Sequence, residues 1–469
     1  MKLLVITDII TKKTYLMTFV AWAIILADVV FGTFLDRFGK PLDSNFGVAL
    51  FIAMTAAVFF AGLYLLRDCM KVLRKDLEGQ SFFNRLYRAT PKFLYALLAI
   101  FAAIIVEMVV FSQYSTALII PLVLISGIVP MLFFGFRTFK FLSWFKSSSN
   151  KRRNAMILAF AVSSMLFAIS VTTTTVLDTK VFVFSRPQAI TPAYQSSNDI
   201  TITLSGTENL VLLYVFIVPV VLAIPAETVA VAFFLRFFKD QIGRATFWAI
   251  VILPPFLNFF GIFAPQLLTT GSAFVYADPR FIYFRIIGTA GWVAADFVIL
   301  FAYLLVARTV EKQVGSAGNK KIINYLIIAA LSTILVSPTA NNWIPNASYP
   351  PFGAIQRALA VLGAFMFTIG IYAVSLSLVQ DAELRNLARR YAKDYALLDT
   401  LGNAQMEAEV TRKVVKLVRQ QADVMERETG VESEMTDDNG VKEYLELVIR
   451  EAREKKALKS GRQPSPSES

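Results

Sequence analysis

Histidine is absent from this chain of 469 residues, and cysteine occurs once. Without imidazole the chain lacks the usual protein ligand of haem, the common ligand of zinc and copper sites, and a histidine general base. The single cysteine, Cys69, cannot form an intrachain disulfide, and it falls in a loop that we predict to be cytoplasmic. We therefore expect no metal site, no cofactor and no enzyme activity.

Charged residues are also scarce, at 17% of the chain, whereas hydrophobic residues make up 56% and the mean hydropathy is +0.58. A soluble domain cannot hide so much apolar surface, but a multi-pass membrane protein turns it toward lipid. Glycine, at 22 residues, is sparse for a bundle whose helix backbones approach closely. The net charge of +12 lies in short loops without interleaved aromatic residues, so we expect no nucleic-acid partner.

Ten apolar runs are candidates to cross a bilayer, which takes about 20 residues. They are residues 15–35, 46–66, 93–113, 116–136, 155–176, 210–235, 246–267, 281–307, 322–337 and 352–379. Basic residues gather before the first run and after the second, fourth, sixth and eighth, and the loop that begins with Arg137 carries no acid. Because lysine and arginine stay on the cytoplasmic side, the sequence predicts an all-α bundle of about ten spans in a cell membrane, with both termini cytoplasmic.

The segments outside these runs differ in composition. We predict an interfacial segment over 1–14, a transmembrane bundle over 15–380 with a large outer loop at 177–209, a helical cytoplasmic tail over 381–459 and a disordered end at 460–469. The outer loop is expected to form a small hairpin or an ordered loop, and Asn346 begins a glycosylation sequon in another outer loop. The tail carries two apolar stripes, which could dock on the bundle, on a second copy or on a cytoplasmic protein.

Two stretches near the end carry a resemblance. YPPFGAIQRA, which leads into the last run, and ALLDTLGNAQMEAEV in the tail resemble an uncharacterised group of archaeal multi-pass membrane proteins over about the last quarter of the chain. The resemblance implies an archaeal cell membrane. It implies no activity and no functional residues.

Six ionisable residues lie inside the runs, where each is costly to bury unless it is paired, solvated or neutralised. On the predicted topology Asp28, Glu107, Arg285 and Arg357 lie toward the outer side, and we expect them to form an ion-pair network there, mainly with a structural role. The alternative for Arg357 is that its side chain reaches up to the outer interface.

The other two acids, Glu227 and Asp296, lie in the middle or inner half, where no run places a basic residue. If they converge, the two carboxylates resist double ionisation and could carry a proton or hold a monovalent cation. The alternative is that each is solitary. Pro219 and Pro225 lie in the same run as Glu227, and Pro225 reads either as the start of a half-helix within the membrane or as a kink in a continuous helix.

The ten runs also divide into five plus five, an architecture similar to that of five-helix inverted-repeat transporters. That pairing matches Asp28 with Glu227 and Glu107 with Asp296. Our leading hypothesis is therefore a proton- or cation-coupled secondary transporter. The alternative is a membrane sensor or scaffold that docks a cytoplasmic partner through its tail, with a membrane enzyme less favoured and an ATP-driven pump unsupported by any P-loop.

Overall fold

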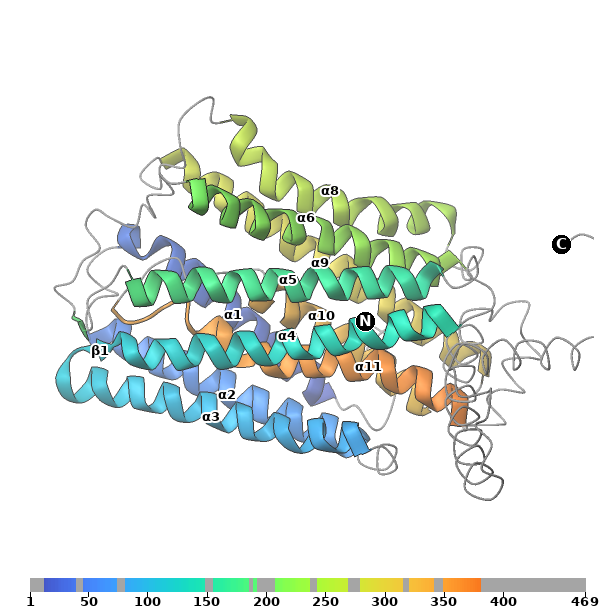
Figure 1. Ribbon diagram of the computed structural model, residues 1–469, viewed down its shortest axis with the longest axis horizontal. Coiled ribbons are helices and arrows are strands. Elements are labelled where there is room, and N and C mark those ends of the chain that lie inside the picture. The colour runs from blue at the N-terminus through green and yellow to red at the C-terminus, as the bar shows by residue number, and fades with distance from the viewer. Residues whose placement is uncertain are drawn as a thin grey trace, which may run out of the picture.

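A computed structural model describes residues 12–38, 45–73, 81–147, 155–184, 189–191, 207–236, 243–268, 279–314, 320–340 and 349–380. Residues 1–11 of the predicted N-terminal segment, most of the outer loop, Asn346, the tail and the C-terminal end lie outside these residues. The described part of the chain forms ten α-helices, one 3-10 helix and two short strands (Figure 1). The prediction of an all-helical bundle is confirmed for this part of the chain.

The helices and strands follow the predicted runs in order. They are α1 (Lys12–Phe38), α2 (Asn45–Leu73), α3 (Ser81–Phe111), β1 (Tyr114–Ser115), α4 (Thr116–Ser147), α5 (Ala155–Phe184), β2 (Ala189–Ile190), α6 (Thr207–Leu235), α8 (Arg244–Leu268), α9 (Pro279–Val314), α10 (Lys320–Ala340), the 3-10 helix η3 (Ile355–Leu359) and α11 (Ala360–Gln380). The strands β1 and β2 pair antiparallel and join the α3–α4 connection to the start of the large outer loop.

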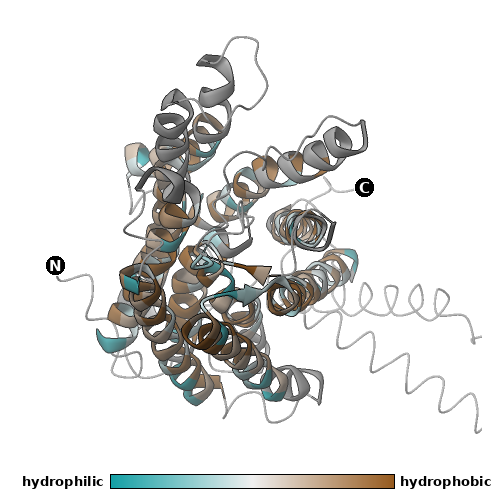
Figure 2. Cartoon of the chain, turned by 90° about the vertical axis from the view of Figure 1, so that its left-hand side faces the viewer, coloured by the Kyte–Doolittle hydropathy of each residue, from teal (hydrophilic) through white to brown (hydrophobic). Residues whose placement is uncertain are grey.

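Six of the described helices carry stretches long and apolar enough to cross a membrane. These stretches are Lys12–Gly32, Asn45–Leu73, Arg88–Phe111, Thr116–Lys146, Ile157–Thr179 and Ile355–Val374, and shorter apolar helices cover Val221–Phe233, Arg244–Phe260 and Ile322–Val336. Apolar residues, in brown, make up most of the coloured helices (Figure 2). Large side chains such as Phe60, Leu132 and Phe256 are exposed. A surface of this kind fits lipid, and a helix satisfies its own backbone there. The ten-span topology and the cytoplasmic termini stay predictions.

Several helices extend beyond the runs that predicted them. Helix α4 continues to Ser147, so Arg137 lies inside a helix and not in the predicted loop. Helix α5 likewise continues to Phe184 and takes Asp178 out of the predicted outer loop. Cys69, predicted in a cytoplasmic loop, is buried within α2. The predictions for these three positions were wrong because a helix need not end where its apolar composition does.

The first eight helices pack in chain order, each against the next, from α1 to α9. Phe297 of α9 then meets α1, with its ring centroid 4.9 Å from that of Trp22 and 6.1 Å from that of Phe19. Helices α10 and α11 pack against each other, and each touches several of the eight. Their described side chains are almost all buried, so these last two helices form the centre of the bundle.

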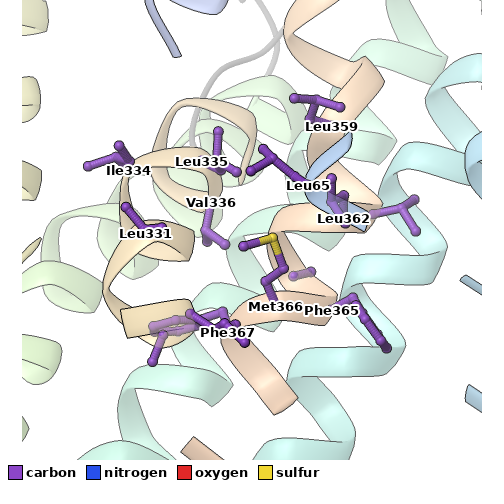
Figure 3. Packing of buried hydrophobic residues seen from close by; sticks show 14 of the residues in the cluster. Leu65, Leu331, Ile334, Leu335, Val336, Leu359, Leu362, Phe365, Met366 and Phe367 are labelled. Carbon is purple, nitrogen blue, oxygen red and sulfur yellow. The ribbon is translucent and has the colours of Figure 1, made fainter. Parts of the chain in front are cut away.

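The contact between α10 and α11 is tight. Side chains that include Leu331, Leu335 and Val336 of α10 face Leu362 and Met366 of α11, as Figure 3 shows. At Gly370 an added Cβ would lie 2.8 Å from the Cβ of Ala329, so only glycine permits this approach of the two backbones. Gly370 is thus placed where two helices meet closely.

Candidate functional site

Glu227 is the centre of a buried polar cluster. Its side chain on α6 is 3% exposed, and both of its carboxylate oxygens accept hydrogen bonds from other helices. The Ser163 hydroxyl of α5 donates to Oε2 over 2.7 Å, and the Tyr303 hydroxyl of α9 donates to Oε1 over 2.7 Å. Three helices therefore meet at one carboxylate.

A fourth helix contributes the positive charge. The Nη2 atom of Arg137, on α4, lies 3.6 Å from Oε2 of Glu227, and the arginine side chain is only 2% exposed. The separation makes an ion pair without a hydrogen bond, because charged N–H···O bonds are about 2.7–2.9 Å long. The expectation that no base lies at the level of Glu227 was therefore wrong.

Aromatic rings surround the guanidinium of Arg137. Its Cζ atom lies 3.9 Å from the ring centroid of Phe367 on α11 and 5.5 Å from the centroids of Phe141 and Phe160. The π faces of these rings attract a cation, and the attraction grows when water is excluded. The rings attract the positive charge but accept no conventional hydrogen bond from its N–H groups.

The helix that carries Glu227 runs unbroken through both prolines, from Thr207 to Leu235. Of the two interpretations of Pro225, the half-helix was wrong and the continuous helix is confirmed. Pro225 lacks an N–H, so the carbonyl of Val221, four residues earlier, loses its usual donor. The Nδ2 atom of Asn258, on α8, donates to that carbonyl over 3.1 Å and replaces the missing bond.

We predict that Asn258→Leu destabilises the protein by about 1 kcal/mol, because the buried Val221 carbonyl then lacks a donor. Adding Pro225→Ala should remove most of this cost, since the backbone N–H at position 225 can bond to Val221 itself. Thermal unfolding of the purified protein in detergent measures both effects. The explanation fails if Asn258→Leu is equally costly in the two backgrounds.

Asp296 is buried on α9 but is not among the hydrogen-bond or ion-pair partners that Glu227 has within the described residues. It precedes Tyr303 by two helical turns, so it lies on the same face, about 10 Å away along the axis. The structure therefore puts a base and two hydroxyls, and not the second acid, against Glu227.

A second buried cluster lies where the chain enters the central helix. Asp28 of α1 accepts backbone N–H groups from Gly353, over 2.8 Å, and from Gln356, over 2.9 Å. Gly353 has a φ of +90°, which favours glycine. An added Cβ at Gly32, one turn after Asp28, would lie 2.7 Å from the Gly353 Cα. The missing side chain at Gly32 thus lets α1 lie directly against this turn.

Two of the other residues predicted to form the outer network, Arg357 and Glu107, bond to groups outside it. Arg357 donates through Nη2 to Oδ2 of Asp178 over 2.6 Å, and neither side chain is more than 1% exposed. Arg357 is therefore buried and does not reach up to the interface. Glu107 accepts the backbone N–H of Ser115 over 2.6 Å. The side chain of Arg285 lies outside the described residues.

The two clusters lie toward opposite ends of the bundle. Ser163 is near the start of α5 and Asp178 near its end, while η3 carries Arg357 and the following α11 carries Phe367. The helices run along the long axis of the molecule, and the β1 end is opposite the end of α4 at Ser147 (Figure 1). Helix α5 and the η3–α11 segment therefore connect both buried charge clusters.

The chain matches no protein-family model, no curated protein and no solved structure. The resemblance to archaeal membrane proteins stays a prediction. Within the described residues no group of three or more histidine, cysteine, aspartate or glutamate side chains is arranged to hold a metal ion. The two buried clusters are therefore the features from which a function can be inferred.

Proposed function

We propose that this protein is a proton-coupled secondary transporter of the cell membrane in which Glu227 gains and loses the coupling proton. The observation that supports this is one carboxylate, buried among apolar helices, that is bonded from α5 and α9 and faces an arginine of α4. Ionisable groups at such positions are rare because they are costly, and they commonly mark ion pathways.

The neighbouring arginine favours a proton over a metal cation as the coupling ion. A sodium ion at Glu227 would lie close to the guanidinium of Arg137, whose nearest nitrogen is 3.6 Å from the carboxylate. Like charges repel strongly at that range in a medium of low dielectric constant. A proton, in contrast, is absorbed into a covalent O–H bond and leaves one positive charge on Arg137.

Protonation would change the forces between helices. With Glu227 ionised, α6 and α4 attract each other through the ion pair, and with Glu227 neutral that attraction is lost while the hydroxyl contacts can persist. Coupling requires such a difference between two states. In the predicted orientation the cluster lies in the cytoplasmic half, so the ion pair would hold the inner side closed. The sensor or scaffold alternative depends on the tail over 381–459, which lies outside the described residues.

The test is whether Glu227 takes up a proton, which infrared difference spectroscopy measures without a known substrate. On acidification we expect the purified protein to gain a carboxylic-acid C=O band that is absent from Glu227→Gln. The band should persist in Glu107→Gln, the same chemical change at an acid that is bonded to β1. In proteoliposomes, Glu227→Gln should abolish the accumulation of substrate inside the vesicles that a pH gradient drives.

The proposal is overturned if the titrating band is the same in wild type and Glu227→Gln, because Glu227 would then keep one protonation state throughout. Unchanged gradient-driven accumulation in the variant would contradict it equally. Monodisperse size-exclusion profiles and equal helical circular dichroism establish that the two glutamine variants are folded.

A further inference from the structure

Arg137 has more hydrogen-bonding capacity than its surroundings use. Atoms Nε, Nη1 and Nη2 are all buried, and none has a hydrogen-bond partner within the described part of the chain. A guanidinium carries five N–H donors, and buried donors are normally satisfied. The oxygens of Glu227 are already bonded to Ser163 and Tyr303, and the nearer one stays 3.6 Å from Nη2.

The chemistry of the guanidinium indicates which acceptor would complete its hydrogen bonds. Phe367, Phe141 and Phe160 attract the guanidinium through their π faces but accept no conventional hydrogen bond. The free N–H groups lie in the guanidinium plane, where two parallel donors match two oxygens of a planar anion. A carboxylate or nitrate fits this edge.

We propose that Arg137 is the binding group for a small planar monoanion and that this anion is the transported substrate. The inference deepens the proposed function, on which it rests. With Glu227 ionised, the pair is neutral, and an added anion would leave one uncompensated negative charge in the membrane. With Glu227 protonated, the anion neutralises Arg137. Anion binding and proton binding therefore favour each other, and each bound anion is accompanied by one proton.

This coupling is reciprocal, because a proton that raises the affinity for the anion must be bound more tightly when the anion is present. The site thus predicts co-transport of one proton with one monoanion, with no net charge moved. Lysine at position 137 would keep the charge but lose the planar pair of donors.

Formate, acetate and nitrate are the probes, added to the full-length protein in detergent at constant ionic strength with sodium gluconate as the replacement salt. We expect each probe to raise the thermal midpoint, with an affinity that weakens as the pH rises, and to cause proton uptake in lightly buffered solution. Arg137→Gln should lose both effects, and Arg137→Lys should bind about tenfold more weakly. Glu227→Gln, which imitates the protonated acid, should bind the probes with an affinity independent of pH and without proton uptake.

The inference is overturned if the probes have no effect on wild type at any pH, or if they stabilise Arg137→Gln as much as wild type. If Arg137→Gln does not fold, Arg137→Lys and Glu227→Gln decide the question. The two proposals fail separately. Anion binding without pH dependence, together with no titrating Glu227 band, refutes proton coupling but keeps the anion site. A titrating band without anion binding refutes only the anion site.

Discussion

Arg357→Gln is expected to destabilise the bundle by about 3–5 kcal/mol, because it takes the guanidinium away from the buried carboxylate of Asp178. The two side chains form a 2.6 Å ion pair between η3 and α5, and both are almost completely excluded from solvent. When one partner of such a pair is removed, the remaining charge stays buried with neither water nor that partner to stabilise it, and the folded state loses free energy. The double variant Asp178→Asn with Arg357→Gln should recover most of the loss, since it removes both charges.

Thermal unfolding in detergent ranks these variants, and unfolding in mixed micelles gives the free energies. Lys71→Gln is the control, because its ion pair with Asp68 joins a lysine side chain that is 61% exposed and should contribute less than about 1 kcal/mol. If Arg357→Gln is no more harmful than the double variant, the pair is not a mutually dependent unit and this explanation is wrong.

The helical content of the fold could be predicted from the sequence because each long apolar run must form a helix to satisfy its backbone in lipid. The ends of the helices could not. The segment after Arg137 continues with Phe139, Phe141 and Trp144, a pattern that keeps the helix going although its charges read as a loop. That aromatic continuation was the available signal that Arg137 lies in a helix.

The partner of Glu227 could not be predicted, because it depends on which helices lie side by side. The predicted topology gives the depth of a residue in the membrane but not which helices are neighbours. It therefore suggested Asp296 as the partner of Glu227. The partner in the structure is Arg137 of α4, because α4 packs against α5 and α5 packs against α6. The effect of Pro225 could not be predicted for a similar reason. The hydrogen bond that it removes is replaced by one from Asn258, which lies on another helix. The sequence correctly singled out Glu227 as the acid to explain.

The inverted-repeat relation between Asp28 and Glu227 stays a prediction, and the surroundings of the two acids differ. Asp28 accepts only backbone N–H groups among the bonds described for it, from a turn next to η3, whereas Glu227 accepts hydroxyls and faces a guanidinium. A carboxylate held by backbone amides fixes the chain in place. A carboxylate that is bonded by side chains can change its hydrogen-bond partners when it gains or loses a proton, because side chains can rotate. We therefore assign Asp28 to the structure of the central turn, and only Glu227 has surroundings that suit the proposed proton exchange.

The assignment of Asp28 predicts a large and local effect. Asp28→Ala should cost about 2–6 kcal/mol, because two buried N–H groups, those of Gly353 and Gln356, lose their acceptor and each such loss costs about 1–3 kcal/mol. Asp28→Asn keeps one acceptor oxygen and should lose about half as much. The turn should open before the rest of the bundle, since only its own hydrogen bonds are removed.

Hydrogen–deuterium exchange distinguishes this local effect from general destabilisation. In Asp28→Ala the peptide that covers residues 349–359 should exchange faster by at least about tenfold, while peptides from α4 and α5 change little. Glu107→Gln is the matched control, because Glu107 accepts one backbone N–H in a partly exposed connection and its loss should leave residues 349–359 protected. Equal acceleration across all helices would contradict a role confined to the turn.

Because this turn leads directly into Arg357, its opening should also weaken the ion pair between Arg357 and Asp178. The loss of stability in the double variant Asp28→Ala with Arg357→Gln should therefore be smaller than the sum of the losses in the two single variants.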